Sequence, residues 1–132
     1  MAKLPNPPSQ AIIYKDKKVY AALASYPIVD GHIIVVWKKS VRDISLLSCK
    51  EYDYLMNVVD LVRDTMLKEL KIKKVYLMYM DEIKHVHWHL IPRYNIKGFA
   101  LLRHKPHHIT KFSQSKKLQA AIQKSINSHH EI

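Results

Sequence analysis

Cysteine and glycine are nearly absent from this chain of 132 residues, which has one cysteine and two glycines. A single thiol, Cys49, excludes a disulfide within the chain. No run of eighteen consecutive apolar residues is present, so no membrane-spanning helix is expected. The first residues also lack the apolar stretch of a secretory signal peptide. Together these absences predict a cytoplasmic protein without a membrane partner.

Acidic residues are scarce as well, because eleven Asp and Glu stand against 22 Lys and Arg, for a net charge of +11. That balance suits an anionic partner, either a polyphosphate or a nucleic acid. The lysines are scattered, and basic residues do not alternate with the aromatic residues that stack single-stranded bases. We therefore do not expect a specific nucleic-acid partner.

Three histidines alternate with bulky apolar residues in the run His-Val-His-Trp-His-Leu-Ile-Pro-Arg, which covers residues 85–93. Successive side chains of a β-strand point to opposite faces. In a strand over residues 83–92, His85, His87 and His89 would line one face. The apolar residues between them would be buried on the other face, which would fix the register.

Four interpretations of this run remain open from the residues alone. The first is a histidine-rich strand without chemistry, and the second is a zinc site, for which three histidines and a water are suitable ligands. Three alternate positions on one strand are spread over about 13 Å, which converges poorly on one ion. The third is nucleophilic catalysis by the middle imidazole, and the fourth is anion binding without turnover.

The pattern along the chain predicts an α+β fold, with an antiparallel sheet of about five strands, one long helix and a C-terminal helix. The expected strands cover residues 11–14, 19–24, 32–37, 75–80 and 83–92. Ser48 and Glu51 form a capping box for the long helix, and apolar residues follow it at helical spacing. A second helix is expected over residues 115–127. We divide the chain into an N-terminal arm (1–11), a domain (12–112), and a C-terminal helix and tail (113–132).

The histidine run resembles the motif of the histidine triad superfamily of nucleotide hydrolases and transferases, in which three histidines alternate with apolar residues and Pro-Arg often follows. Upstream, residues 30–38 resemble the family's Gly-His followed by an apolar strand and a lysine. Residues 43–45, Asp-Ile-Ser, are similar to the Asp-Leu-Ser that precedes the family's long helix. The resemblance covers residues 12–95 and implies the triad family's fold within the α+β class.

The resemblance also implies residue roles. His87 would be the nucleophile that forms a nucleotidyl-histidine intermediate, which water then hydrolyses. His85 and His89 would bind phosphate oxygens and hold His87 in its reactive tautomer, and His32 would orient the three. The family mechanism implies no cofactor and no metal ion, and the family's usual assembly implies a homodimer.

Several recognition positions depart from the family pattern. Ala24 occupies the place of an Asp or Asn that holds the ribose in many members, and residues 81–84 replace a Gly-Gln-Ser/Thr loop. The positions that correspond to nucleotide-binding residues are His32, Ala24, Ile34, Asp81, Glu82 and Ile83. The implied substrates are dinucleoside polyphosphates such as diadenosine tetraphosphate. The alternatives are a nucleoside phosphoramidate hydrolase or nucleotidyltransferase, and a nucleotide-binding protein with little turnover.

Overall fold

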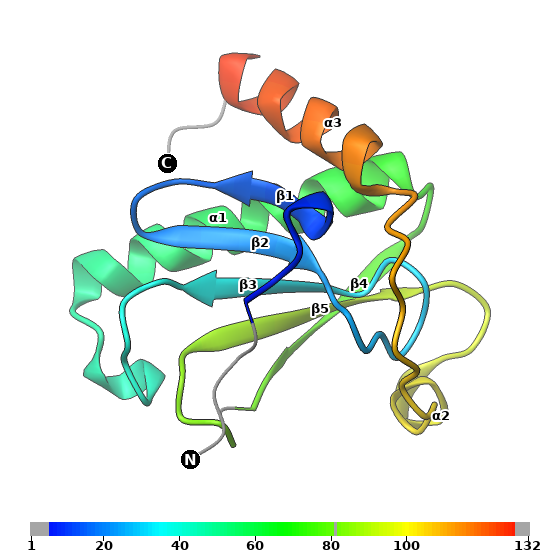
Figure 1. Ribbon diagram of the computed structural model, residues 1–132, viewed down its shortest axis with the longest axis horizontal. Coiled ribbons are helices and arrows are strands. Elements are labelled where there is room, and N and C mark those ends of the chain that lie inside the picture. Colours follow the sequence, from blue (N-terminus) through cyan, green and yellow to red (C-terminus); the bar gives the residue numbers. More distant parts are fainter. Residues whose placement is uncertain (1–5, 81, 129–132) are drawn as a thin grey trace.

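A computed structural model describes residues 6–80 and 82–128 of the chain. Five strands form one antiparallel sheet in the order β1-β2-β3-β5-β4 (Figure 1). The strands are β1 (Ile12–Lys15), β2 (Val19–Leu23), β3 (Ile33–Trp37), β4 (Lys74–Tyr79) and β5 (His87–Arg93). The helices are α1 (Cys49–Glu69), α2 (Gly98–Leu102) and α3 (Ser115–Ser128), with short 3₁₀ helices η1 (Ser9–Ala11) and η2 (Ile44–Leu46). The predicted α+β class is confirmed.

The long helix α1 covers one face of the sheet and lies behind it in Figure 1. Its first turn is closed by the predicted capping box, in which Ser48 and Glu51 each accept the other's backbone N–H. Its apolar stripe, with Leu55, Val58 and Val62 fully buried, forms the core with the inner face of the sheet. α3 packs against both α1 and β1.

Strand alternation then decides which side chains face away from α1. His87 pairs with Val36 and His89 pairs with Ile34 across the β3–β5 ladder, so these four side chains share a face. Leu90, on the opposite face, is fully buried in the core. We call the side that carries His87 and His89 the histidine face.

The triad strand is shorter than predicted, because β5 begins at His87 and His85 lies before it. The expectation of three histidines on one strand is therefore wrong for His85. Lys84 adopts a left-handed conformation with φ of 56°, which turns the chain just ahead of the strand. Val86 is held by hydrogen bonds to Val41 and Trp37 rather than within a strand.

Other differences are small. The remaining strands match the expected ones within one residue at each end, and the second helix extends one residue further, to Ser128. The short helices η1, η2 and α2 have no counterpart in the sequence-based expectation. Within the proposed N-terminal arm, Ala11 is fully buried at the end of η1. No helix in the described part of the chain is long and apolar enough to cross a membrane.

Candidate active site

A backbone group just before β5 holds the His87 ring in one orientation. The side chain is only 4% exposed, and its Nδ1 lies 2.7 Å from the carbonyl oxygen of His85. A carbonyl can only accept a hydrogen bond, so Nδ1 must be the donor. In the neutral ring the lone pair is therefore on Nε2. This is the tautomer that an imidazole needs to attack through Nε2.

His32 and His89 form a hydrogen-bonded pair whose direction is set by one backbone amide. The N–H of Ile28 donates to Nδ1 of His32 over 3.0 Å, so the proton of the neutral His32 ring is on Nε2. That Nε2 lies 2.9 Å from Nδ1 of His89 and donates to it. The neutral His89 ring then carries its own proton on Nε2. The His89 ring can therefore donate a hydrogen bond from Nε2, the nitrogen that does not contact His32.

Burial keeps both of these rings neutral. Burial, and to a lesser degree His89, lowers the pKa of His32 to about 3. Burial, followed by the neighbouring His87, lowers the pKa of His89 to about 4. Removing water from an imidazole disfavours its charged form. At pH 7 the pair therefore acts through N–H groups and not through positive charge.

His85 contacts the rest of the site mainly through its backbone. Its Nε2 lies 2.6 Å from the carbonyl oxygen of Trp37, at the end of β3, and donates to it. That Nε2–H is therefore not available to a phosphate oxygen. Its carbonyl instead accepts the proton of His87 Nδ1. In this geometry His85 joins β3 to β5 and fixes the His87 tautomer.

The loop between β2 and β3 brings His32 next to His89. Gly31 has φ of 88°, and a Cβ there would lie 3.0 Å from the Tyr94 hydroxyl and 3.2 Å from a Leu70 methyl. The Tyr94 hydroxyl donates to the carbonyl of Asp30 over 2.8 Å. Glycine is therefore required at this position by both its backbone and its surroundings.

The remaining predicted positions contribute less. Ala24 is buried and donates its backbone N–H to the His32 carbonyl over 2.9 Å, but it offers no polar side chain. Ile34 lies next to His89 by register. Glu82 is exposed and Ile83 is half-buried, and no hydrogen bond or ring contact joins either of these two described residues to the imidazoles. Asp81 lies outside the described residues.

The groups that sequence reasoning missed are all in the backbone: the Ile28 amide and the carbonyls of His85 and Trp37. Every residue carries these groups, so no pattern in the sequence could have identified them. Residues 6–80 and 82–128 contain no group of three His, Cys, Asp or Glu side chains arranged to hold a metal ion.

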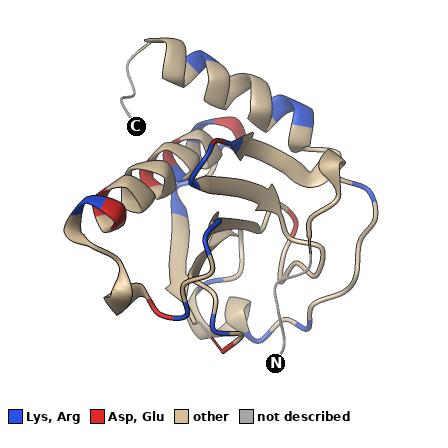
Figure 2. Ribbon diagram, turned by 60° about the vertical axis from the view of Figure 1, so that its left-hand side comes forward, with Lys and Arg blue, Asp and Glu red and all other residues tan. Residues whose placement is uncertain are grey.

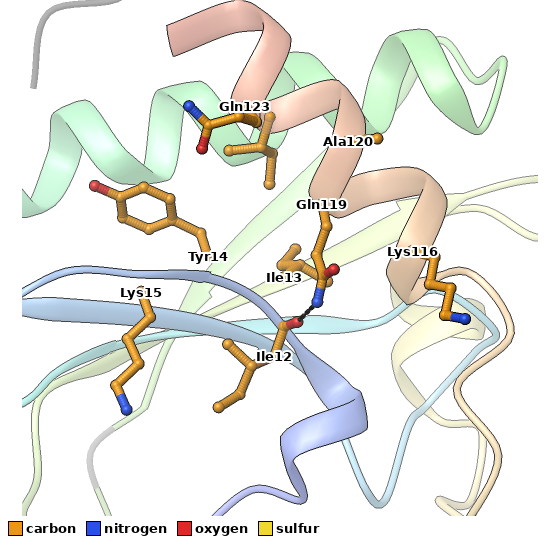
Figure 3. Close-up of a pocket in the computed structure, with 9 residues that line it drawn as sticks. Ile12, Ile13, Tyr14, Lys15, Lys116, Gln119, Ala120 and Gln123 are labelled. Atoms are coloured by element: carbon orange, nitrogen blue, oxygen red, sulfur yellow. Dashed lines mark hydrogen bonds between the residues drawn. The ribbon is translucent and has the colours of Figure 1, made fainter.

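A separate cavity of about 480 Å³ lies between β1 and α3. Figure 3 shows Gln119 at this cavity, where its side-chain amide donates to the Ile12 carbonyl. None of the four histidines described above lines it. It is not part of the candidate active site.

The family model of the HIT domain matches residues 7–96, which include His32 and the three clustered histidines. The chain belongs to the HIT domain family. A curated relative, bis(5'-adenosyl)-triphosphatase of Saccharomyces cerevisiae, is 27% identical over 97 residues, or 68% of this chain and 47% of that protein. The chain thus spans about half the length of the curated relatives that it matches.

Solved HIT structures have the same fold. A hypothetical histidine triad nucleotide-binding protein from Sulfolobus tokodaii is 26% identical, with a TM-score of 0.67 over 89% of this chain and 83% of that one. A diadenosine triphosphate hydrolase from Plasmodium falciparum, solved with cyclomarin A, has a TM-score of 0.64 at 18% identity. It covers 95% of this chain and 82% of that one. At that identity the second likeness shows the fold alone.

Proposed function

We propose that this HIT domain protein hydrolyses nucleotides at the α-phosphate, with dinucleoside polyphosphates as its substrate class. The observation that carries the proposal is the fixed tautomer of His87, whose Nδ1 donates to the His85 carbonyl over 2.7 Å. An attacking imidazole requires a lone pair on the remaining nitrogen and a ring that cannot rotate. The family and the triphosphatase activity of the yeast relative support the same substrate class.

The reaction has two steps. Nε2 of His87 attacks the α-phosphorus, a P–N bond forms, and the P–O bond to the leaving phosphate breaks. Water then attacks the same phosphorus, breaks the P–N bond and returns the neutral imidazole. The products are a nucleoside monophosphate and the remaining nucleotide. The water molecule adds its hydroxyl group to the phosphorus and releases its other proton. None of these steps requires a cofactor.

His89 is the group suited to the developing negative charge on phosphorus. Its Nε2–H is directed by the His32 contact, and a fixed donor costs no reorganisation when charge appears on an oxygen. His32 acts as a positioning residue because its Nε2–H already donates to His89. His85 acts in the same way, through its carbonyl and its contact with Trp37.

A panel of substrates tests the proposal. The purified protein is incubated with diadenosine tri- and tetraphosphate, an adenosine phosphoramidate and an uncharged ester control, and nucleoside monophosphate release is measured. We expect release from the polyphosphates in the wild type and a loss of several orders of magnitude in His87→Asn. Near-normal turnover by His87→Asn would overturn the proposal.

The same panel separates the alternatives. Ala24 lacks the Asp or Asn side chain that many family members use for the ribose, which favours weak nucleotide binding or slow turnover. Calorimetric binding of a nucleotide without any release of product would support a binding protein with little turnover. Preferred cleavage of the phosphoramidate would support the phosphoramidate hydrolase alternative, and transfer of the nucleotidyl group to an added acceptor would support a transferase.

We further propose a homodimer, formed through the free edge of β4. This strand pairs only with β5 in the described sheet, and Leu77 on it is 37% exposed. An unpaired strand edge is a template for pairing with a second chain. Analytical ultracentrifugation should give a dimer in the wild type and a monomer in Leu77→Lys. A wild type that is monomeric at micromolar concentration would contradict this assembly.

A further inference from the structure

The long helix α1 is rich in acidic residues. α1 contains five of the eleven Asp and Glu residues but only three of the 22 Lys and Arg residues. Figure 2 shows these acidic positions (red) along that helix. Because α1 covers the opposite face of the sheet, these five carboxylates lie away from the histidine face. A cation on the histidine face is separated from these carboxylates by the sheet.

Lys38 is such a cation. Its backbone N–H donates to the Lys18 carbonyl over 2.8 Å, so the β2–β3 ladder continues one residue past Trp37. Alternation after Ile34 and Val36 puts Lys38 on the histidine face. Lys38 directly follows Trp37, whose carbonyl oxygen lies 2.6 Å from Nε2 of His85, so the backbone of Lys38 lies beside the His85 ring. The bond from the His85 ring to the Trp37 carbonyl keeps the two segments together at this point.

The neighbouring lysines point elsewhere. The ammonium group of Lys18 lies 4.8 Å from the centre of the Tyr54 ring, on α1. Lys39 lies near Glu51, whose pKa is lowered by its hydrogen bonds to Ser48 first and by Lys39 after them. Lys38 is half-buried and forms no ion pair with any residue in the described part of the chain. Its charge is therefore available at the His85 end of the site.

We propose that Lys38 binds the phosphate chain of the leaving group and makes the enzyme specific for polyphosphate substrates. The four histidines of the site form a row with two different ends. The His32–His89 end is buried and neutral, whereas the His85 end carries this cation. When the bond between the α-phosphorus and its bridging oxygen breaks, negative charge grows on the departing phosphate. An ammonium group beside it stabilises that charge more than the charge of the ground state.

This inference rests on the proposed phosphoanhydride hydrolysis, and a ratio of two substrates tests it. A dinucleoside tetraphosphate has an anionic leaving group, whereas a nucleoside phosphoramidate has an amine. We expect the ratio of their kcat/KM values to fall about tenfold in Lys38→Ala, the usual size of one lost charge-assisted contact. Lys38→Arg, which keeps the charge, should retain most of the ratio.

Lys39→Ala is the matched control, since it removes the same charge from the adjacent residue on the other side of the sheet. Its ratio should equal that of the wild type. An equal loss in Lys38→Ala and Lys39→Ala would show a general effect of surface charge and overturn the inference. An unchanged ratio in Lys38→Ala, or a fall in Lys38→Arg as large as in Lys38→Ala, would overturn it as well.

Binding of inorganic tripolyphosphate, measured by calorimetry, separates this inference from the proposed activity. We expect several-fold weaker binding to Lys38→Ala than to the wild type and to Lys39→Ala. If the wild type cleaved neither substrate but showed this difference, the proposed hydrolysis would fail and the Lys38 site would stand. Equal tripolyphosphate binding by all three proteins would overturn the site, and so would a Lys38-dependent affinity confined to single-stranded oligonucleotides.

Discussion

At the scale of single residues, the candidate active site depends on backbone groups that determine where each imidazole proton lies. The Ile28 amide fixes the proton of His32 on Nε2, and His32 in turn fixes the proton of His89. The His85 carbonyl does the same for His87. These three hydrogen bonds thus prepare His87 as a nucleophile and its neighbour His89 as a donor.

Removing the donor to His89 should therefore reduce turnover more than substrate binding. In His32→Phe, the Nδ1 of His89 loses its partner and the ring is free to adopt the other tautomer. We expect kcat to fall about a hundredfold with a small change in KM, since misplaced catalytic groups cost rates of that order. His32→Asn, which can both accept and donate, should recover part of the loss. Steady-state kinetics with a dinucleoside polyphosphate measures both, and an unaltered kcat in His32→Phe would refute the role of the pair.

Glu82 provides the opposite case. It falls where many family members have a Ser or Thr that serves the leaving group, but its side chain is exposed and forms no hydrogen bond with the imidazoles. An ionised carboxylate can only accept a hydrogen bond. Glu82→Ser should therefore leave turnover unchanged, or raise it by adding a donor. A large fall in turnover with a shifted pH–rate profile would mean that the carboxylate takes part in the chemistry.

At the scale of elements, the sequence predicted what depends on periodic patterns and failed where single contacts decide. The capping box of Ser48 and Glu51 and the apolar stripe of α1 could be predicted because local chemistry and core burial agree there. The start of β5 could not, because the left-handed Lys84 and the Val86 hydrogen bonds to distant segments end the strand before His85. Alternating residues indicate a strand but do not show how far its ladder extends.

The two glycines allow a comparison at this scale. Both have positive φ, 88° at Gly31 and 59° at Gly98, but a Cβ would meet three neighbours at Gly31 and nothing within 4 Å at Gly98. Gly98→Ala should therefore cost about 1 kcal/mol of unfolding free energy, from backbone strain alone. Gly31→Ala should cost roughly 1–3 kcal/mol more and displace the loop that holds His32. Urea unfolding of the two variants measures the difference, and equal losses would argue against the contacts at Gly31.

At the scale of the whole molecule, the buried histidines couple stability to pH. Burial lowers the pKa of His32 to about 3 and that of His89 to about 4. In the unfolded chain both histidines have the ordinary pKa near 6.5. Between the lowered and the ordinary pKa values, the unfolded chain therefore binds more protons than the folded protein. The contribution of these two groups to the free energy of unfolding is then fully present above about pH 6.5, and it is lost as the pH drops towards 4 and 3.

Urea unfolding at several pH values between 4 and 7 measures this dependence. The free energy of unfolding should rise with pH across that window in the wild type. The slope should be smaller in His32→Asn, which has one fewer shifted group. Substitution of the exposed His107 should leave it unchanged. A wild-type stability that is flat between pH 4 and 6.5 would show that these rings titrate normally in the folded protein.

The central claim is that His87 forms a covalent bond to the α-phosphorus of the substrate, and intact-protein mass spectrometry after rapid acid-free quenching tests it most directly. During turnover of a diadenosine polyphosphate, the account predicts a protein species heavier by one adenylyl group. Peptide mapping should locate that group on His87, and the species should be absent in His87→Asn. Sustained turnover with no such species at any quench time, or an adenylyl group on another residue, would contradict the account.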